Sequence, residues 1–242
     1  MAHAAFSVLA AELAASLLRG RHLVLWGPRG AGKSTLLNAV LRELGNTHSA
    51  LSPATGSLDD ITRALERAYK ETRTSGISRR AARSRLWWAA DAAPGCILLD
   101  HVTRVPSAMK GCLRRLRGGV VGVILAVDVD SPRERERLRA MKLGCTSMRM
   151  PRSASRSLAL LLNQSWENRA AFPLTASDKN TLVRAARGRP GWIMRCAARA
   201  ADPRYWVDGL LHARLLALDT EMELRAPQSL TASPAALPTR LT

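Results

Sequence analysis

The chain has 242 residues, of which 47% are hydrophobic, so it is long enough and apolar enough to bury a sizeable core. This composition excludes a disordered or fibrous protein, and no apolar run approaches the length of a membrane span. Its 37 Lys and Arg residues against 19 Asp and Glu residues give a formal net charge of +18. This excess indicates a polyanionic partner, nucleic acid before an anionic membrane, unless a general bias toward arginine makes every surface basic.

The chain opens with the apolar segment MAHAAFSVLAAELAASLLRG, which predicts a short amphipathic helix leading into a strand. It has no basic start and carries Glu12 inside the apolar stretch, which argues against a signal peptide. The four cysteines lie far apart without a C-x-x-C pair, and they predict reduced core residues in a cytoplasmic protein with no membrane partner. They are Cys96, Cys112, Cys145 and Cys196.

A glycine-rich stretch follows the predicted strand HLVLW (residues 22–26) and precedes a predicted helix over residues 34–44. It reads GPRGAGKS, the pattern G-x-x-x-x-G-K-S of a phosphate-binding loop. Lys33 is expected to reach the β- and γ-phosphates of ATP from a solvated position, and the Ser34 hydroxyl is expected to bind Mg²⁺. The other predicted nucleotide contacts of the loop are Gly27, Pro28, Arg29, Gly30, Ala31, Gly32 and Thr35.

The next predicted elements are a short strand over residues 47–52, a helix over 58–69 and a helix over 78–93. The third element has a basic first half, with Arg79, Arg80, Arg83 and Arg85, followed by Trp87 and Trp88. The two indoles either stack on single-stranded bases beside the arginines or pack, one into the core and one against a neighbouring subunit. Packing is the preferred interpretation.

The apolar run GCILLDHV (residues 95–102) predicts a buried parallel strand that ends near Asp100. A carboxylate in this place, after the phosphate-binding loop, is suited to hold Mg²⁺ through a water molecule. Asp100 is therefore predicted to be the second metal-site residue beside Ser34.

A helix over residues 106–117 is predicted to pack on the sheet through an apolar face of Met109, Cys112, Leu113 and Leu116. Lys110, Arg114 and Arg117 fall on another face at i, i+4 and i+7, and they form the predicted nucleic-acid contact. A strand over 119–130, a charged helix over 131–141 and a short strand over 145–151 follow. This alternation predicts an α/β fold, with a parallel sheet sandwiched by helices.

Beyond Pro151 the predicted elements are helical, over residues 153–171, 175–188, 191–201 and 205–224. The predicted domains are therefore an ATPase core over residues 1–150 with its N-terminal helix, and a small all-helical lid over 151–225. Residues 226–242 have no acidic residue and little periodicity, and they predict a disordered tail.

These motifs resemble those of the AAA+ P-loop ATPases. GPRGAGKS has the GxxGxGK[ST] form of that family, and CILLD is similar to its metal-binding strand. VILAVDVD is similar to the strand that ends in a polar sensor, which the resemblance places at Asp128 or, further along, at Asp130. ARGRPGWIMR (residues 186–195) is similar to the lid segment that carries a second sensor.

The sequence departs from the family pattern at two sites. His101 stands where the family has a water-polarising glutamate, and a largely neutral imidazole in this place implies slow hydrolysis. Gly191 stands where the family has the sensor arginine, which leaves Arg189 or Arg195 as substitutes.

The resemblance also implies an arginine finger that acts on a neighbouring subunit, for which Arg133, Arg135, Arg137 and Arg139 are available. The preferred alternative is a solvated helix in which Glu134 and Glu136 pair with Arg137 and Arg139.

Within AAA+, the chain looks most similar to the branch of DNA-transposition ATPases of the Mu B and TnsC kind and of replication initiators and loaders. The resemblance implies a homo-oligomeric ATPase that binds DNA through its backbone and regulates a protein such as a transposase, nuclease or helicase. The alternative is a nucleotide-dependent signalling or scaffold switch with a protein partner and no direct DNA binding. A small-molecule kinase is disfavoured because no acceptor-binding motif is visible.

Overall fold

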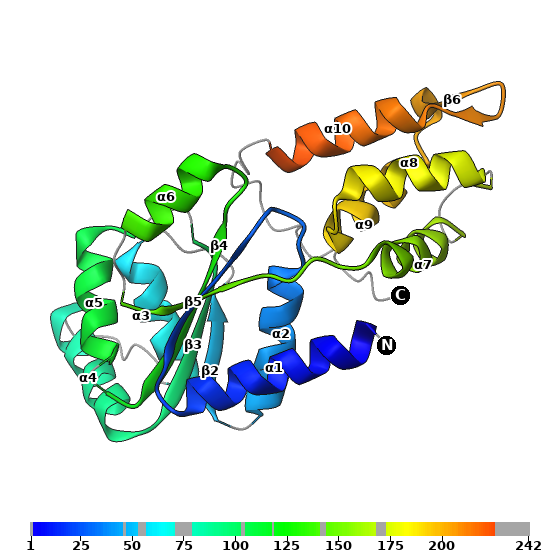
Figure 1. Ribbon diagram of the computed structural model, residues 1–242. Coiled ribbons are helices and arrows are strands. Elements are labelled where there is room, and N and C mark those ends of the chain that lie inside the picture. The colour runs from blue at the N-terminus through cyan, green and yellow to red at the C-terminus, as the bar shows by residue number, and fades with distance from the viewer. Residues whose placement is uncertain are drawn as a thin grey trace, which may run out of the picture.

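A computed structural model describes residues 2–45, 47–52, 57–70, 79–102, 105–117, 119–140, 144–167 and 173–225. Five parallel strands form one sheet in the order β2-β3-β4-β1-β5 (Figure 1). The strands are β1 (His22–Gly27), β2 (His48–Ser52), β3 (Gly95–Val102), β4 (Val121–Asp128) and β5 (Thr146–Arg149). The predicted α/β sheet is confirmed, and β4 lies between the strand that leads into the glycine-rich loop and the strand that carries Asp100.

Helices cover both faces of the sheet, which is why β3 and β4 are apolar at nearly every position. The helices α1 (Ala2–Leu18) and α2 (Lys33–Leu44) share a core with strand residues such as Leu25 and Leu98. The helices α3 (Leu58–Ala68), α4 (Arg79–Ala92) and α5 (Ser107–Arg117) share the core of the other face, which includes Leu99. Leu138 of α6 (Pro132–Ala140) also packs there. All these elements were predicted from the sequence.

The lid follows β5 and has a core of its own, which includes the fully buried Trp192 and Tyr205. Its helices are α7 (Ser155–Glu167), α8 (Ala176–Ala186), α9 (Pro190–Arg199) and α10 (Ala213–Arg225), with a 3-10 turn at Pro203–Tyr205. Figure 1 shows these helices together at one side of the sheet. The helical character of this part is as predicted.

The prediction of one helix over residues 205–224 is wrong in its first half. The strands β6 (Trp206–Val207) and β7 (Leu210–Leu211) form an antiparallel hairpin there, and α10 begins only at Ala213. Asp208 and Gly209 have φ values of 51° and 76°, as a two-residue type I′ turn requires. The dipeptide Asp-Gly between apolar residues is a known hairpin signal, and it outweighs the helical periodicity here.

Cys96, Cys112 and Cys196 are buried and Cys145 is half-buried, and no disulfide links these four described residues, as predicted. Burial raises the pKa of Cys96 to about 11 and that of Cys196 to about 12. Both thiols are therefore unreactive at neutral pH. In the described part of the chain, no helix is long and apolar enough to cross a membrane. The predicted tail, 226–242, lies outside the described residues.

Candidate functional site

The glycine-rich loop connects the end of β1 at Gly27 to the start of α2 at Lys33. Gly30 and Gly32 have φ values of 76° and 95°, which side-chain-bearing residues rarely adopt, and Gly32 directly precedes α2. A Cβ on Gly27 would lie 3.0 Å from the Cβ of Met150, so the backbone is packed too closely for a side chain. The loop thus takes the conformation that its glycines predict. The first turn of α2 follows directly, and a helix N-terminus is suited to bind an anion.

Lys33 is nearly fully buried, with 5% of its surface exposed, and it folds back over the loop. Its Nζ donates hydrogen bonds to the carbonyl oxygens of Gly27 (2.8 Å) and Pro28 (2.9 Å), and it lies 2.6 Å from Oδ1 of Asp128. The expectation that this lysine is solvated is therefore wrong, because loop carbonyls and a carboxylate take the place of water.

Strand register brings Asp128 to the loop. The parallel pairing of β1 with β4 sets Gly27 opposite Asp128, although they are far apart in sequence. Burial alone would raise the pKa of the Asp128 carboxyl, but the hydrogen bonds and charges of His101 and Lys33 lower it to about 2. Asp128 is therefore ionised at neutral pH and forms an ion pair with Lys33.

Asp100 and His101 lie at an irregularity near the end of β3. The pairing with β4 shifts register between Leu99 and Val102, and His101 has a left-handed φ of 49°. The Asp100 side chain is buried, and its Oδ1 accepts a hydrogen bond of 2.9 Å from the His101 amide. The irregularity turns the imidazole toward two carboxylates, because its Nδ1 lies 3.8 Å from Asp128 Oδ2 and its Nε2 lies 3.7 Å from Asp100 Oδ2.

The surroundings of His101 shift the pKa of its imidazole. Its contact with Asp128 raises the pKa of the imidazole, burial lowers it, and the charge of Asp100 raises it again, so that the net shift is upward. More of the imidazole is therefore protonated at neutral pH than in an isolated histidine. Lys33, Asp128, His101 and Asp100 form a row of ionisable side chains, called the charge row below.

The residues present suit an ATP–Mg²⁺ complex. The loop offers amides and Lys33 to phosphate oxygens, while Ser34, half-buried in the first turn of α2, and the buried Asp100 offer oxygen ligands. Among the described residues, no group of three or more His, Cys, Asp or Glu side chains is arranged to hold a metal ion.

The lid touches the loop backbone directly. The Gly191 amide, in the first turn of α9, donates a hydrogen bond of 2.8 Å to the Gly30 carbonyl. A Cβ on Gly191 would lie 3.0 Å from Gly30 Cα and 3.1 Å from its carbonyl oxygen. This contact explains why a glycine stands where the resemblance implies an arginine: any side chain at this position would push the lid away from the loop.

The two predicted substitutes for that arginine are engaged inside the lid. Arg189 is buried, and its Nη2 lies 2.5 Å from Oε2 of Glu221 on α10. Arg195 Nη1 lies 2.6 Å from Oε1 of Glu223 on the same helix. In the structure, both arginines therefore bind carboxylates of α10.

Arg29 has a role that sequence reasoning missed, because the motif leaves its position unspecified. Its amide donates to Asp130 Oδ1 (3.0 Å), and its Nε lies 3.4 Å from Asp128 Oδ2. Its Nη1 donates to the carbonyl oxygen of Leu224, in the last turn of α10, at 3.1 Å. One side chain thus ties the loop, the end of β4 and the lid together.

We expect Arg29→Ala to loosen the lid while the core stays folded. The variant loses the ion pair with Asp128 and the charge-assisted hydrogen bond to the Leu224 carbonyl, and a bond of this kind typically contributes about 1.5–3 kcal/mol. Hydrogen exchange should then quicken at the Gly191 amide, while the amides of β3 and β4 keep their protection. Arg133→Ala, at an exposed position on α6, is the matched control. If the Gly191 amide is equally protected from hydrogen exchange in the wild type and in Arg29→Ala, Arg29 does not hold the lid against the loop.

A cavity of about 280 Å³ lies beside the loop and is lined by Arg149, Met150, Pro151 and Arg152. Met150 fixes its place, because its amide donates to the Trp26 carbonyl at 2.7 Å and its side chain packs under Gly27 and Gly32. The guanidinium groups of Arg149 and Arg135 lie 5.5 Å and 5.1 Å from the centre of the Trp26 ring. The sequence alone gave no role to Arg149 or Met150, and it offered Arg135 only as a candidate arginine finger.

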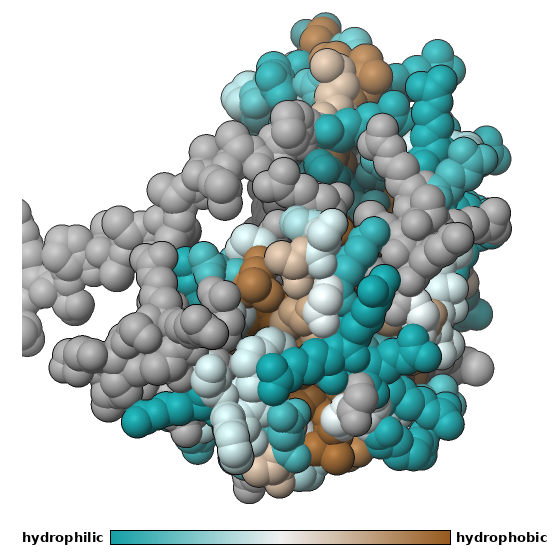
Figure 2. Space-filling model, turned by 90° about the vertical axis from the view of Figure 1, so that its left-hand side faces the viewer, coloured by the Kyte–Doolittle hydropathy of each residue, from teal (hydrophilic) through white to brown (hydrophobic). Residues whose placement is uncertain are grey.

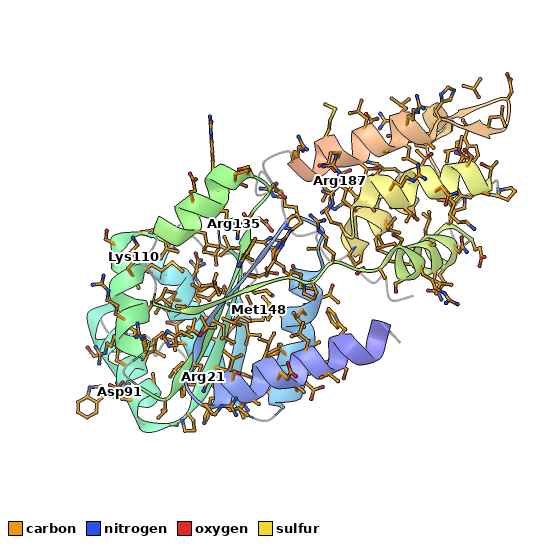
Figure 3. The ribbon with its side chains drawn as sticks, in the orientation of Figure 1. Arg21, Asp91, Lys110, Arg135, Met148 and Arg187 are labelled. Atoms are coloured by element: carbon orange, nitrogen blue, oxygen red, sulfur yellow. The ribbon has the colours of Figure 1, made fainter. Side chains whose placement is uncertain are left out.

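The other predicted contact residues lie on the helices of one side of the core. On α5, Arg114 and Arg117 are exposed and Lys110 is half-buried, while the predicted apolar face is buried (Figure 3 labels Lys110). On α6, the carboxylate of Glu134 accepts the amides of Asp130 (2.6 Å) and Ser131 (2.9 Å), which caps the helix. Of the four candidate fingers, Arg133 and Arg135 are exposed, and the side chains of Arg137 and Arg139 lie outside the described set.

A comparison with protein-family models matches residues 18–129 to the AAA domain. No curated protein matches the chain significantly. Among solved structures, a mutant of RuvB from Thermotoga maritima is similar, with 16% identity, a TM-score of 0.47, and coverage of 90% of this chain and 68% of that one. The branch of DNA-transposition ATPases stays a prediction. The loop, the order of the strands and the family match together identify an AAA-type P-loop fold, whose AAA domain match spans residues 18–129.

Proposed function

We propose that the chain is an ATP-binding, slowly hydrolysing ATPase that works as an oligomer, binds DNA and controls a protein partner. The observation that carries the nucleotide part is the geometry of the loop. Gly30 and Gly32 hold left-handed conformations, and Lys33 is fastened over the loop by two carbonyl oxygens beside the carboxylate of Asp128. This arrangement fixes the Lys33 ammonium group at the loop, where it is suited to bind a phosphate oxygen.

In this proposal, Lys33 and the loop amides hold the phosphates, and Ser34 and Asp100 hold Mg²⁺. The bound ion supplies charge neutralisation on the phosphate oxygens. A triphosphate competes with Asp128 for Lys33, so that ATP binding changes the pairing within the charge row. Asp128 keeps contacts with Arg29 and His101 when it leaves Lys33. Through Arg29, whose Nη1 is bonded to Leu224 of α10, this change reaches the lid.

Slow hydrolysis is proposed because His101 stands in place of a carboxylate and brings no negative charge to polarise the attacking water. Its contact with Asp128 raises the pKa of the imidazole, so the protonated fraction, which has no lone pair to accept a proton, is larger than in an isolated histidine. The protein would then respond mainly to ATP occupancy, and bound ATP would act as a long-lived structural ligand.

The DNA part of the proposal rests on charge. The chain has a formal net charge of +18, and α5 carries Lys110, Arg114, Arg115 and Arg117 without an acidic residue. A backbone-directed contact is proposed because no base-reading motif is present in the sequence. The controlled protein is proposed to be a transposase, nuclease or helicase.

The second candidate, a nucleotide-dependent switch with a protein partner and no direct DNA binding, is favoured by one observation. Leu215, Leu218 and Met222 lie at i, i+3 and i+7 on α10 and are 43%, 58% and 61% exposed. An apolar stripe in water is suited to a protein contact, with either another copy or a different protein.

A titration with fluorescent duplex DNA, with and without ATP, separates the two candidates. We expect binding that falls steeply with salt, by about 10³- to 10⁵-fold between roughly 50 and 200 mM if six to ten phosphates are contacted. Replacing Lys110, Arg114 and Arg117 together by Glu should weaken binding about 10- to 100-fold for every sequence, and should lower the salt slope by about three.

The matched control is the triple Glu variant of Arg184, Arg187 and Arg214, three exposed lid arginines, since it changes the net charge equally. An equal loss of affinity in both triple variants would mean that net charge alone acts. Binding that ignores salt or prefers one sequence would count against backbone-directed contact, and absence of binding would favour the switch.

A further inference from the structure

The two adjacent tryptophans of α4 have different environments. Trp87 is half-buried, packs against the core of the α3–α5 face, and is covered by the Arg115 guanidinium at 4.6 Å from the ring centre. Trp88 is 78% exposed, the highest value among the large exposed hydrophobic residues described. The preferred interpretation, in which both indoles pack, therefore holds within the chain for Trp87 only.

The helix of Trp88 and the neighbouring helix α5 both carry exposed basic residues. Arg85 is exposed one helical turn before it, and Arg114 and Arg117 are exposed on α5. The neighbouring Arg115 joins the two helices, because its Nη2 donates to Asp91 Oδ2 at 3.4 Å. Among the described side chains of α4 and α5, Asp91 is the sole acid, and it forms an ion pair with Arg115.

These residues share one side of the molecule. Figure 1 shows α4 and α5 together beside α3, and Figure 3 labels Asp91 and Lys110 on this side. Figure 2 views the molecule from this side, and its described surface is mainly hydrophilic, with small hydrophobic areas. Arg85 and Trp88 of α4, together with Lys110, Arg114, Arg115 and Arg117 of α5, are called the α4–α5 face below.

An exposed indole among cations fits one class of partner best. An apolar protein surface would cover the indole but would also strip water from the surrounding arginines, which is unfavourable without matching acids. A single-stranded nucleic acid supplies phosphates for the arginines and unpaired bases for the indole. Duplex DNA supplies the phosphates but keeps its bases stacked on each other.

We infer that the α4–α5 face binds single-stranded nucleic acid, with one base stacked on Trp88 and the backbone held by the arginines of α4 and α5. This inference deepens the proposed function, on whose basic surface it rests, because it names unpaired strands as the preferred nucleic acid.

The test compares Trp88→Ala with the wild type on three fluorescent probes of equal length: oligo(dT), an abasic oligomer with the same phosphates, and a duplex. Stacking of one base is worth about 1–3 kcal/mol, so Trp88→Ala should lose about 5- to 150-fold in affinity for oligo(dT). Affinity for the abasic oligomer and the salt slope should stay unchanged, because no phosphate contact is removed. Trp88→Phe should recover most of the loss.

Leu160→Ala is the matched control, since it removes an exposed apolar side chain on α7, away from the α4–α5 face. Unchanged oligo(dT) affinity in Trp88→Ala, together with weaker binding in the Lys110, Arg114 and Arg117 variant, would overturn the stacking and leave the proposed function standing. A wild type that binds none of the probes would overturn both. A Trp88→Ala protein that sediments as a smaller species and keeps its oligo(dT) affinity would show that Trp88 is a subunit contact.

Discussion

Replacing Lys33 with alanine is expected to weaken ATP binding by about 30- to 5,000-fold, the range that follows from losing one partner of a desolvated charge pair. The side chain lies over the loop with 5% of its surface exposed, so water cannot replace it in contact with a phosphate. A titration with a fluorescent ATP analogue in the presence of Mg²⁺ measures the effect. Lys110→Ala, which removes the same charge from α5, is the matched control.

The variant needs a check on folding, because Lys33 is paired and buried. Its loss leaves the Gly27 and Pro28 carbonyls without their lysine donor, while Asp128 keeps contacts with Arg29 and His101. We expect a modest loss of stability and an unchanged circular dichroism spectrum, with affinity measured well below the unfolding temperature. ATP affinity equal to that of the wild type in a folded Lys33→Ala protein would show that the loop is not the nucleotide site.

The second large effect is expected at His101. A carboxylate that orients the attacking water is typically worth about 10²- to 10⁴-fold in rate, so His101→Glu should accelerate single-turnover hydrolysis by up to that factor. The wild type should turn over slowly, and His101→Ala should change the rate little, because neither side chain brings a negative charge to orient the attacking water. Single-turnover rates at matched ATP occupancy provide the measurement.

A further control variant is needed because His101 has a left-handed backbone conformation, which a substitution can strain. A left-handed conformation costs ordinary residues about 1–2 kcal/mol, whereas asparagine tolerates it. His101→Asn therefore keeps the backbone geometry without adding a carboxylate, and it should hydrolyse ATP as slowly as the wild type. If His101→Glu hydrolyses ATP faster than the wild type and His101→Asn does not, the carboxylate is the cause of the acceleration.

The rival account makes Asp128, or a carboxylate of a neighbouring subunit, the group that orients water. The structure makes this testable within the chain, because Asp128 contacts both Lys33 and His101. A collapse of the rate in Asp128→Asn with unchanged ATP affinity would support Asp128 in that role. Brisk wild-type turnover that collapses in His101→Ala would show instead that the histidine is itself catalytic.

Much of the fold could be predicted because its signals are local. The strand, the glycine-rich loop and the helix that follow one another over residues 22–44 are encoded by neighbouring residues, and so are the apolar runs of β3 and β4. The hairpin at Trp206–Leu211 was missed although its Asp-Gly signal is also local, because apolar residues on both sides fit a helix equally well.

Neighbouring residues alone were enough to specify the loop, the alternation of strands and helices, and the carboxylate at the end of β3. Which side chains meet depends on the packing of the whole chain. The position of β4 beside β1 sets Asp128 against Lys33, and the lid sets Gly191 against Gly30. Packing also covers Trp87 while its neighbour Trp88 stays exposed. Glycine torsions and apolar runs act over a few residues, whereas these contacts depend on strand order and helix packing between distant parts of the chain.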